Sequence, residues 1–118
     1  MLTLPPNTVV LLHRHPVDIR KSFDGLLGIV RNALHDDPLS PTFFVFFNKD
    51  RNKVKIFYWD NDGFAIWYKR LEKGTFHLTL PLTDEASITL TRAQLAMLLE
   101  GIDFQNVKRR KRFSKKSA

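Results

Sequence analysis

The sequence contains no cysteine, which excludes disulfide bonds and thiolate metal sites and agrees with a reducing compartment. It also lacks a long apolar run. The N-terminus has no basic beginning, and its apolar stretch Val9–Leu12 is far shorter than a signal-peptide core or a membrane span. We therefore expect a soluble, cytoplasmic protein that makes no membrane contact.

The sequence also lacks the signatures of nucleophilic catalysis and nucleotide binding, such as a G-x-S-x-G segment or a glycine-rich phosphate loop. Its carboxylates show no spacing that suits a two-metal centre. Asp18 and Asp24 are six residues apart and do not share a helix face, and Asp60 and Asp62 lie in a turn. The remaining acidic candidates, Glu72, Glu100 and Asp103, are scattered. We predict that the protein is not an enzyme.

The histidines and the acidic turn give little indication of a metal site. His13 and His15 would point the same way on an extended chain, and with Asp18 or His35 they could hold a divalent cation, but ordinary histidines explain them better. A calcium loop with Gly63 at its sixth position would begin at Tyr58, which supplies no carboxylate. We expect no metal and no cofactor.

The formal charge of +7 is concentrated at the C-terminus. Residues 1–107 hold 12 cationic and 12 acidic side chains, so this part is neutral. All of the excess comes from the last eleven residues, whose cations are Lys108, Arg109, Arg110, Lys111, Arg112, Lys115 and Lys116. This segment has too few apolar residues to fold alone, and we predict a domain over residues 1–107 and a disordered basic tail over 108–118.

A cationic tail is suited to neutralising phosphates and releasing counterions, and Phe113 could stack on a base. The alternative is a solvated terminus that keeps a neutral domain soluble. We favour non-specific contact with DNA, because a neutral body gives no other reason for the concentration of charge. Lys69 and Arg70 form a second candidate patch, but a polar strand end and turn explain it better because Glu72 offsets part of the charge.

The fold is expected to centre on residues 54–76. Asp60-Asn61-Asp62-Gly63 is a run of turn formers between two segments rich in aromatic and β-branched residues, which predicts a β-hairpin. Both faces of this hairpin are largely apolar. We therefore expect it to be central in its sheet, with one face on helices and the other covered by chain or by a partner. The aromatic side chains could stack on bases, but aromatics on a small sheet are more often core.

The remaining pattern predicts an α+β fold, an antiparallel β-meander packed by two helices. One helix is expected from Asp18, as N-cap, to Leu34, and the other follows the capping-box pattern Thr91-x-x-Gln94 and stops at Gly101. Strands are expected at Val9–His13, Thr42–Phe47, Lys53–Trp59, His77–Leu80 and Ser87–Leu90.

Three segments together resemble a known family. They are DIRKSFDGL (residues 18–26), VFFNKDRNKVKIFYWDNDGFAIWYKRLEKGTF (45–76) and LTRAQLAMLLEGID (90–103). In order and spacing the chain is similar to the TnpB accessory proteins of the insertion-sequence-sixty-six family of bacterial transposons over most of residues 8–104. These are distinct from the RNA-guided nuclease that shares the name TnpB, whose long chain and nuclease carboxylates are absent here.

The resemblance implies a role in DNA transposition beside a separate, larger transposase that carries the strand-transfer chemistry. It supplies no catalytic residues. Two hypotheses follow: a DNA-contacting accessory factor, or a protein-interaction module that docks on the cognate transposase without binding DNA. Assembly with a second copy of the chain is left open.

Overall fold

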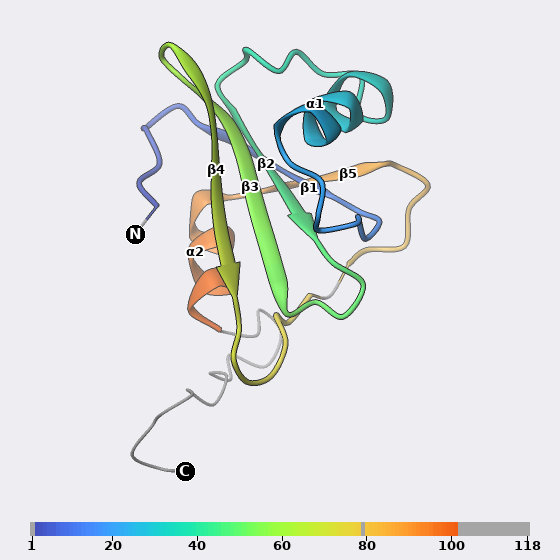
Figure 1. Ribbon diagram of the computed structural model, residues 1–118. Helices are drawn as coiled ribbons and strands as arrows, with labels where there is room; N and C mark the ends of the chain where they lie inside the picture. The colour runs from blue at the N-terminus through green and yellow to red at the C-terminus, as the bar shows by residue number, and fades with distance from the viewer. Residues whose placement is uncertain (1, 79, 102–118) are drawn as a thin grey trace.

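The computed structural model describes residues 2–78 and 80–101 and contains a five-stranded sheet and two helices (Figure 1). In chain order the elements are β1 (Val9–His13), α1 (Phe23–Asn32), β2 (Thr42–Phe47), β3 (Lys53–Asp60), β4 (Gly63–Arg70), β5 (Ser87–Leu90) and α2 (Arg92–Glu100). The α+β class is confirmed.

The strand order across the sheet is β4-β3-β2-β1-β5. Three of its four pairings are antiparallel, but β1 and β2 run parallel, with Val10 opposite Phe43. The expected antiparallel meander is therefore correct for β2, β3 and β4 and wrong for β1. A parallel pair needs a long crossover, and here the crossover contains α1.

The predicted hairpin is confirmed, but its expected central position is wrong. β3 and β4 pair along their full length from Lys53 opposite Arg70 to Asp60 opposite Gly63, yet β4 lies at one edge of the sheet. The centre belongs to β2, whose six residues are all buried. Its apolar run has no polar alternation because both faces of the sheet are covered at this strand.

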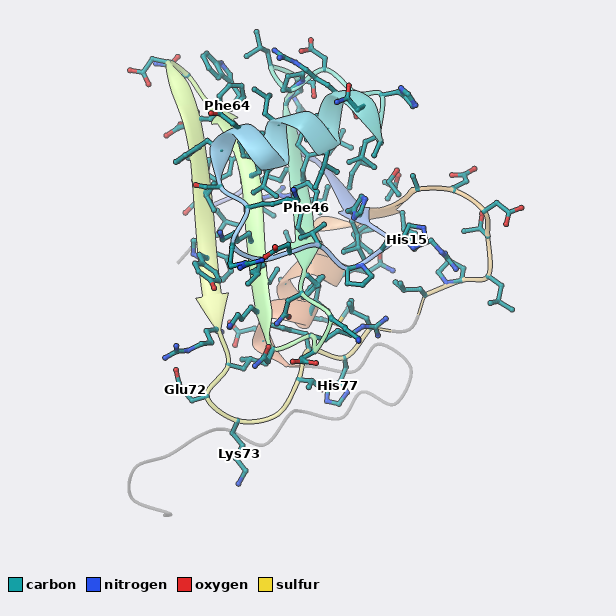
Figure 2. The ribbon with its side chains drawn as sticks, turned by 45° about the vertical axis from the view of Figure 1, so that its right-hand side comes forward. His15, Phe46, Phe64, Glu72, Lys73 and His77 are labelled. Atoms are coloured by element: carbon teal, nitrogen blue, oxygen red, sulfur yellow. The ribbon has the colours of Figure 1, made fainter. Side chains whose placement is uncertain are left out.

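Each face of the sheet is covered by one helix (Figure 2). Side chains of alternate β2 residues point to opposite faces of the sheet. Phe44 and Phe46 pack with Leu26 and Val30 of α1. On the other face lie the core residues Val10, Leu12, Phe43, Val45, Phe47, Val54, Ile56, Phe76, Leu90, Leu95 and Leu98, the last two from α2. The second face of the sheet is thus covered by α2 of the same chain.

The first helix begins at Phe23, five residues later than expected, and ends at Asn32. Asp18 is not its N-cap. The Asp18 carboxylate instead accepts hydrogen bonds from the backbone N–H of Arg20, at 3.0 Å, and from the Arg20 guanidinium, at 2.7 Å. These bonds favour a local turn over a helical start, and Ser22 takes the N-cap position without a side-chain bond.

The second helix is confirmed in detail. Thr91 Oγ1 accepts from the backbone N–H of Gln94, and the Gln94 side chain accepts from the backbone N–H of Thr91, which completes the capping box. Gly101 ends the helix with φ 83°, a left-handed conformation that glycine adopts without steric cost.

The strand expected at His77–Leu80 is wrong. Residues 77, 78 and 80 lie outside the strands, and residue 79 is not described. The segment between β4 and β5 is held instead by backbone hydrogen bonds to the β2–β3 loop, from Leu71 N to Asn52 O at 2.8 Å and from Phe76 N to Arg51 O at 2.7 Å. These bonds draw the two loops together at one end of the sheet.

Candidate nucleic-acid interface

The end of the sheet where β2 stops, β3 starts and β4 stops is rich in cations. Because β2, β3 and β4 are antiparallel, the β2–β3 loop and the segment after β4 both emerge there (Figures 1 and 2). We call this the basic end. Its cations are Lys49, Arg51, Lys53, Lys69, Arg70 and Lys73, and its acidic residues are Asp50, Glu72 and, at the end of α2, Glu100.

The opposite end of the sheet carries carboxylates. Asp60 and Asp62 belong to the tight turn between β3 and β4, in which Asn61 has φ 59°. Asp36 and Asp37 lie in the loop that leads from α1 to the start of β2. We call this the acidic end. The formally neutral body therefore has an uneven charge distribution along its strands.

Lys69 connects the basic end to the second helix. Its Nζ atom donates a hydrogen bond to the backbone carbonyl of Leu99, at 3.3 Å, in the last turn of α2. An ammonium group at this position satisfies one of the terminal carbonyls of the helix and faces the negative end of its dipole. The last turn of α2 thus lies beside the end of β4, and Gly101, which follows it, brings the chain to the basic end.

Arg70 is exposed and forms an ion pair with Glu72. Its Nη2 atom lies 2.9 Å from Glu72 Oε1, and the two side chains are 62% and 54% exposed. An ion pair in this much solvent contributes little to stability. The guanidinium group therefore keeps access to an anion, although Glu72 must share it. Lys69 and Arg70, predicted together, differ in their local roles.

Arg51 is a further cation of the basic end that the sequence did not single out. It has φ 55°, and its Nη1 atom donates to the carbonyl of Leu78 at 3.1 Å. Asn48 fixes the same loop, because its Oδ1 atom accepts from the backbone N–H groups of Asn52 and Lys53 at 3.1 and 3.0 Å. The signal in the sequence was an Asn-rich loop, which indicates a turn but not which arginine it presents.

The predicted tail cations, Lys108 to Arg112, Lys115 and Lys116, lie outside the described residues, as does the expected disorder of 108–118. The structure does show where the chain that leads to them departs. Gly101, the last described residue, ends α2 at the basic end, next to the helix turn that Lys69 contacts. The described chain therefore ends at the end of the sheet that holds Lys69 and Arg70.

A family model described as IS66 Orf2 like protein matches residues 8–109. The chain belongs to the IS66 Orf2-like family. This confirms the resemblance drawn from the sequence and makes the chain an insertion-sequence-associated protein linked to transposition. No solved structure is significantly similar to it.

Two curated relatives of this IS66 Orf2-like chain come from Sinorhizobium fredii strain NGR234. The uncharacterized protein y4jC is 31% identical over 101 residues, which cover 86% of this chain and 85% of the relative. The uncharacterized protein y4hO is 31% identical over 106 residues and 90% of each chain. The similarity therefore extends over nearly the whole length of both relatives.

A second surface of the IS66 Orf2-like chain is an apolar groove of about 300 Å³ between the N-terminal segment, β4 and α2. It is lined by Leu2, Leu4, Trp67, Lys69, Leu95, Ala96, Leu99 and Glu100. Trp67 projects from β4 to the α2 side of the sheet, on the face opposite Phe64 and Ile66. The groove is a hydrophobic depression whose lining includes two charged residues, Lys69 and Glu100.

His13 and His15 lie near the basic end, whereas His35 precedes Asp36 at the acidic end. His13 Nδ1 is 2.6 Å from the carbonyl oxygen of His15, and the two rings are 6.1 Å apart. Burial lowers the pKa of His13, and the hydrogen bond to His15 only partly opposes this effect. Residues 2–78 and 80–101 contain no group of three or more His, Cys, Asp or Glu that could hold a metal ion.

The aromatic side chains of the sheet mostly belong to the core, as favoured from the sequence. Phe44, Phe46 and Phe57 are fully buried. Tyr68 is half exposed, and its ring lies under the Lys55 ammonium group at 4.8 Å. Burial lowers the pKa of Lys55, whose Nζ atom donates to the Lys21 carbonyl at 2.8 Å.

In the part of the chain that the structure describes, no helix is long and apolar enough to cross a membrane.

Proposed function

We propose that this IS66 Orf2-like chain is a non-catalytic accessory protein that assists transposition by contacting DNA. The tail cations Lys108, Arg109, Arg110, Lys111, Arg112, Lys115 and Lys116 neutralise phosphates, and Lys69 and Arg70 extend the contact onto the folded body. The contact is non-specific in sequence. The cognate transposase supplies the strand-transfer chemistry.

The observation that carries the proposal is that the described chain ends, at Gly101, beside the end of the sheet that holds Lys69 and Arg70. Lys69 contacts the last turn of α2, and the chain runs on from Gly101 toward the tail. A polyanion that meets the tail near this end also meets Lys69, Arg70 and the neighbouring loop cations. The acidic end lies at the far ends of the same strands, where its repulsion is screened within about 10 Å at 0.1 M salt.

Binding of full-length and tail-deleted protein to DNA tests the proposal directly. The full chain is titrated against element-end DNA and unrelated DNA at several salt concentrations, beside a chain that ends at residue 107. We expect similar affinities for the two DNAs. Log affinity falls with log salt; the seven tail cations contribute a slope of at most about −6, so the slope becomes much flatter after deletion.

Three outcomes would contradict different parts of the proposal. A preference for element ends would contradict non-specific contact. Equal, salt-insensitive DNA binding by the truncated chain would remove the tail from the mechanism. Turnover of DNA by the purified protein, lost on chelation, would overturn the non-catalytic role itself.

The groove between β4, α2 and the N-terminal segment favours a second candidate function. Its apolar lining suits side chains of a partner protein, so the chain would act as an interaction module on the transposase. A pull-down with the cognate transposase tests this. Capture that survives nuclease treatment and deletion of residues 108–118, and that is lost with Trp67→Ala, supports docking without DNA. Capture that nuclease abolishes speaks against it.

A further inference from the structure

The outer side of β4 is a long, unpaired sheet edge. β4 has eight residues, against four in β5 at the other edge, and β3 pairs with only one side of it. Within residues 2–78 and 80–101, no strand pairs with its outer side. Every second residue of such a strand directs its backbone N–H and C=O away from the sheet, where another strand can bind them.

β4 has few of the features that protect an edge strand. Its first six residues, Gly63–Tyr68, contain no charge and no proline, and four of them are Phe64, Ile66, Trp67 and Tyr68. Tyr68 is 50% exposed. Its charged residues, Lys69 and Arg70, stand only at the end. An edge of this length and composition is a template for pairing, whereas the short β5 is not.

The charges along β4 are complementary to those of a second β4 in the antiparallel direction. The strand begins at the acidic turn that holds Asp60 and Asp62 and ends at Lys69 and Arg70. In a two-fold symmetric pair, the beginning of each strand lies beside the end of the other. The carboxylates of each copy then face the cations of its partner. A parallel arrangement would instead oppose like charges at both ends.

We propose that β4 pairs antiparallel with β4 of a second copy of this chain, which joins two five-stranded sheets into one. The two-fold axis passes near Ile66. Arg70, already beside Glu72, gains a second carboxylate from Asp62 of the partner subunit. The pairing uses the strand edge and not residues 108–118, so the mass of nucleic-acid-free protein tests it separately from DNA binding.

The test is the mass of the full chain in solution, measured by sedimentation equilibrium on nucleic-acid-free protein at about 0.15 M salt, where exposed charges are partly screened. We expect a reversible association to twice 13.8 kDa. A chain that stays monomeric over the whole accessible concentration range overturns the proposal. Because edge pairing alone buries a small area, we expect a dissociation constant in the micromolar range.

Tyr68→Glu is the decisive variant. In the monomer the new carboxylate lies near the Lys55 ammonium group, which favours an intact fold. In the dimer it lies opposite Phe64 of the partner subunit and diagonal to the partner's Asp62, which brings like charges near each other, and we expect at least about tenfold weaker association. Thr89→Glu is the matched control, because Thr89 is exposed on β5 at the other edge. Loss of the dimer in Thr89→Glu but not in Tyr68→Glu would assign the contact to β5 and overturn the proposal.

Charge reversal tests the antiparallel direction and does not depend on Tyr68. Asp62 and Arg70 are both exposed, so single reversals, Asp62→Lys or Arg70→Glu, leave the core unchanged. Each places like charges together in the dimer and weakens it. The double variant restores association to within about threefold of the unmodified chain if the two residues meet across the axis. Additive weakening in the double variant contradicts this geometry.

Discussion

The two ends of the sheet differ in charge although they belong to the same strands. The basic end joins the β2–β3 loop, the end of β4 and the last turn of α2, whereas the acidic end consists of the β3–β4 turn and the loop before β2. Residues 1–107 contain equal numbers of cationic and acidic side chains, so their net charge does not reveal that the two ends differ. The direction in which each strand runs, not the composition of the chain, therefore decides where side chains of each charge gather.

Among substitutions that compare the two ends of the sheet, the largest effect is expected from the charges of Lys69 and Arg70. We predict that Lys69→Gln with Arg70→Gln lowers the slope of log affinity against log salt by about 2, one unit for each lost phosphate contact. The matched change at the other end, Asp60→Asn with Asp62→Asn, leaves the slope unchanged because it removes no phosphate contact. A DNA titration measures both. Equal effects of the two double variants would show that the ends are not distinguished by DNA.

The next effect concerns the start of α2, near the acidic end. Thr91→Ala removes the Oγ1 acceptor of the Gln94 N–H, and we predict a loss of about 1 kcal/mol in the free energy of unfolding. Thr91→Ser keeps the acceptor and should retain most of the stability. Urea denaturation measures both. If Thr91→Ser were as destabilised as Thr91→Ala, the capping bond would not be the cause.

A smaller effect is expected at the other end of the same helix. Lys69→Met keeps much of the side-chain length but removes the donor to the Leu99 carbonyl and the cation near the helix C-terminus. We predict a loss of about 0.3–1 kcal/mol, reduced at high salt because the dipole interaction is screened. Lys69→Arg is the control that keeps a cation. A salt-independent loss would argue for packing rather than charge.

The smallest effect concerns pH and His13. Its pKa is lowered in the folded state by burial, so the unfolded chain binds the proton more readily. Stability is then full above the ordinary value of 6.5 and falls as the pH decreases through 6.5 toward the folded pKa. One pKa unit corresponds to about 1.4 kcal/mol, and the half-buried ring should contribute less. Denaturation at pH 7.5 and 5.5 should show a difference that His13→Gln reduces.

Local signals in the sequence predicted local structure well. The turn at Asp60–Gly63, the capping box at Thr91 and the stop at Gly101 are each decided by neighbours within four residues, and all three are confirmed. The start of the first helix failed for the same kind of reason. Asp18 is a good N-cap in general, but Arg20 lies two residues away and binds its carboxylate with both backbone and guanidinium.

Non-local arrangement could not be predicted from these signals. Two apolar faces on the hairpin suggested a central position, yet the same pattern fits a strand whose two faces are covered by α1 and α2 while its edge stays free. The candidate site depended on strand direction as well. Lys69 and Arg70 were found from charge alone, but the contact from Lys69 to Leu99, which connects them to the end of α2, joins residues 30 positions apart.

The place of β1 has a consequence for synthesis on the ribosome. β1 lies between β2 and β5, so the first strand to emerge pairs on one side with residues that follow 74 to 80 positions later. Until Ser87–Leu90 leaves the exit tunnel, the nascent chain exposes both the outer side of β1 and the apolar face that α2 later covers. Elongation that pauses before this segment should therefore leave an intermediate that chaperones recognise.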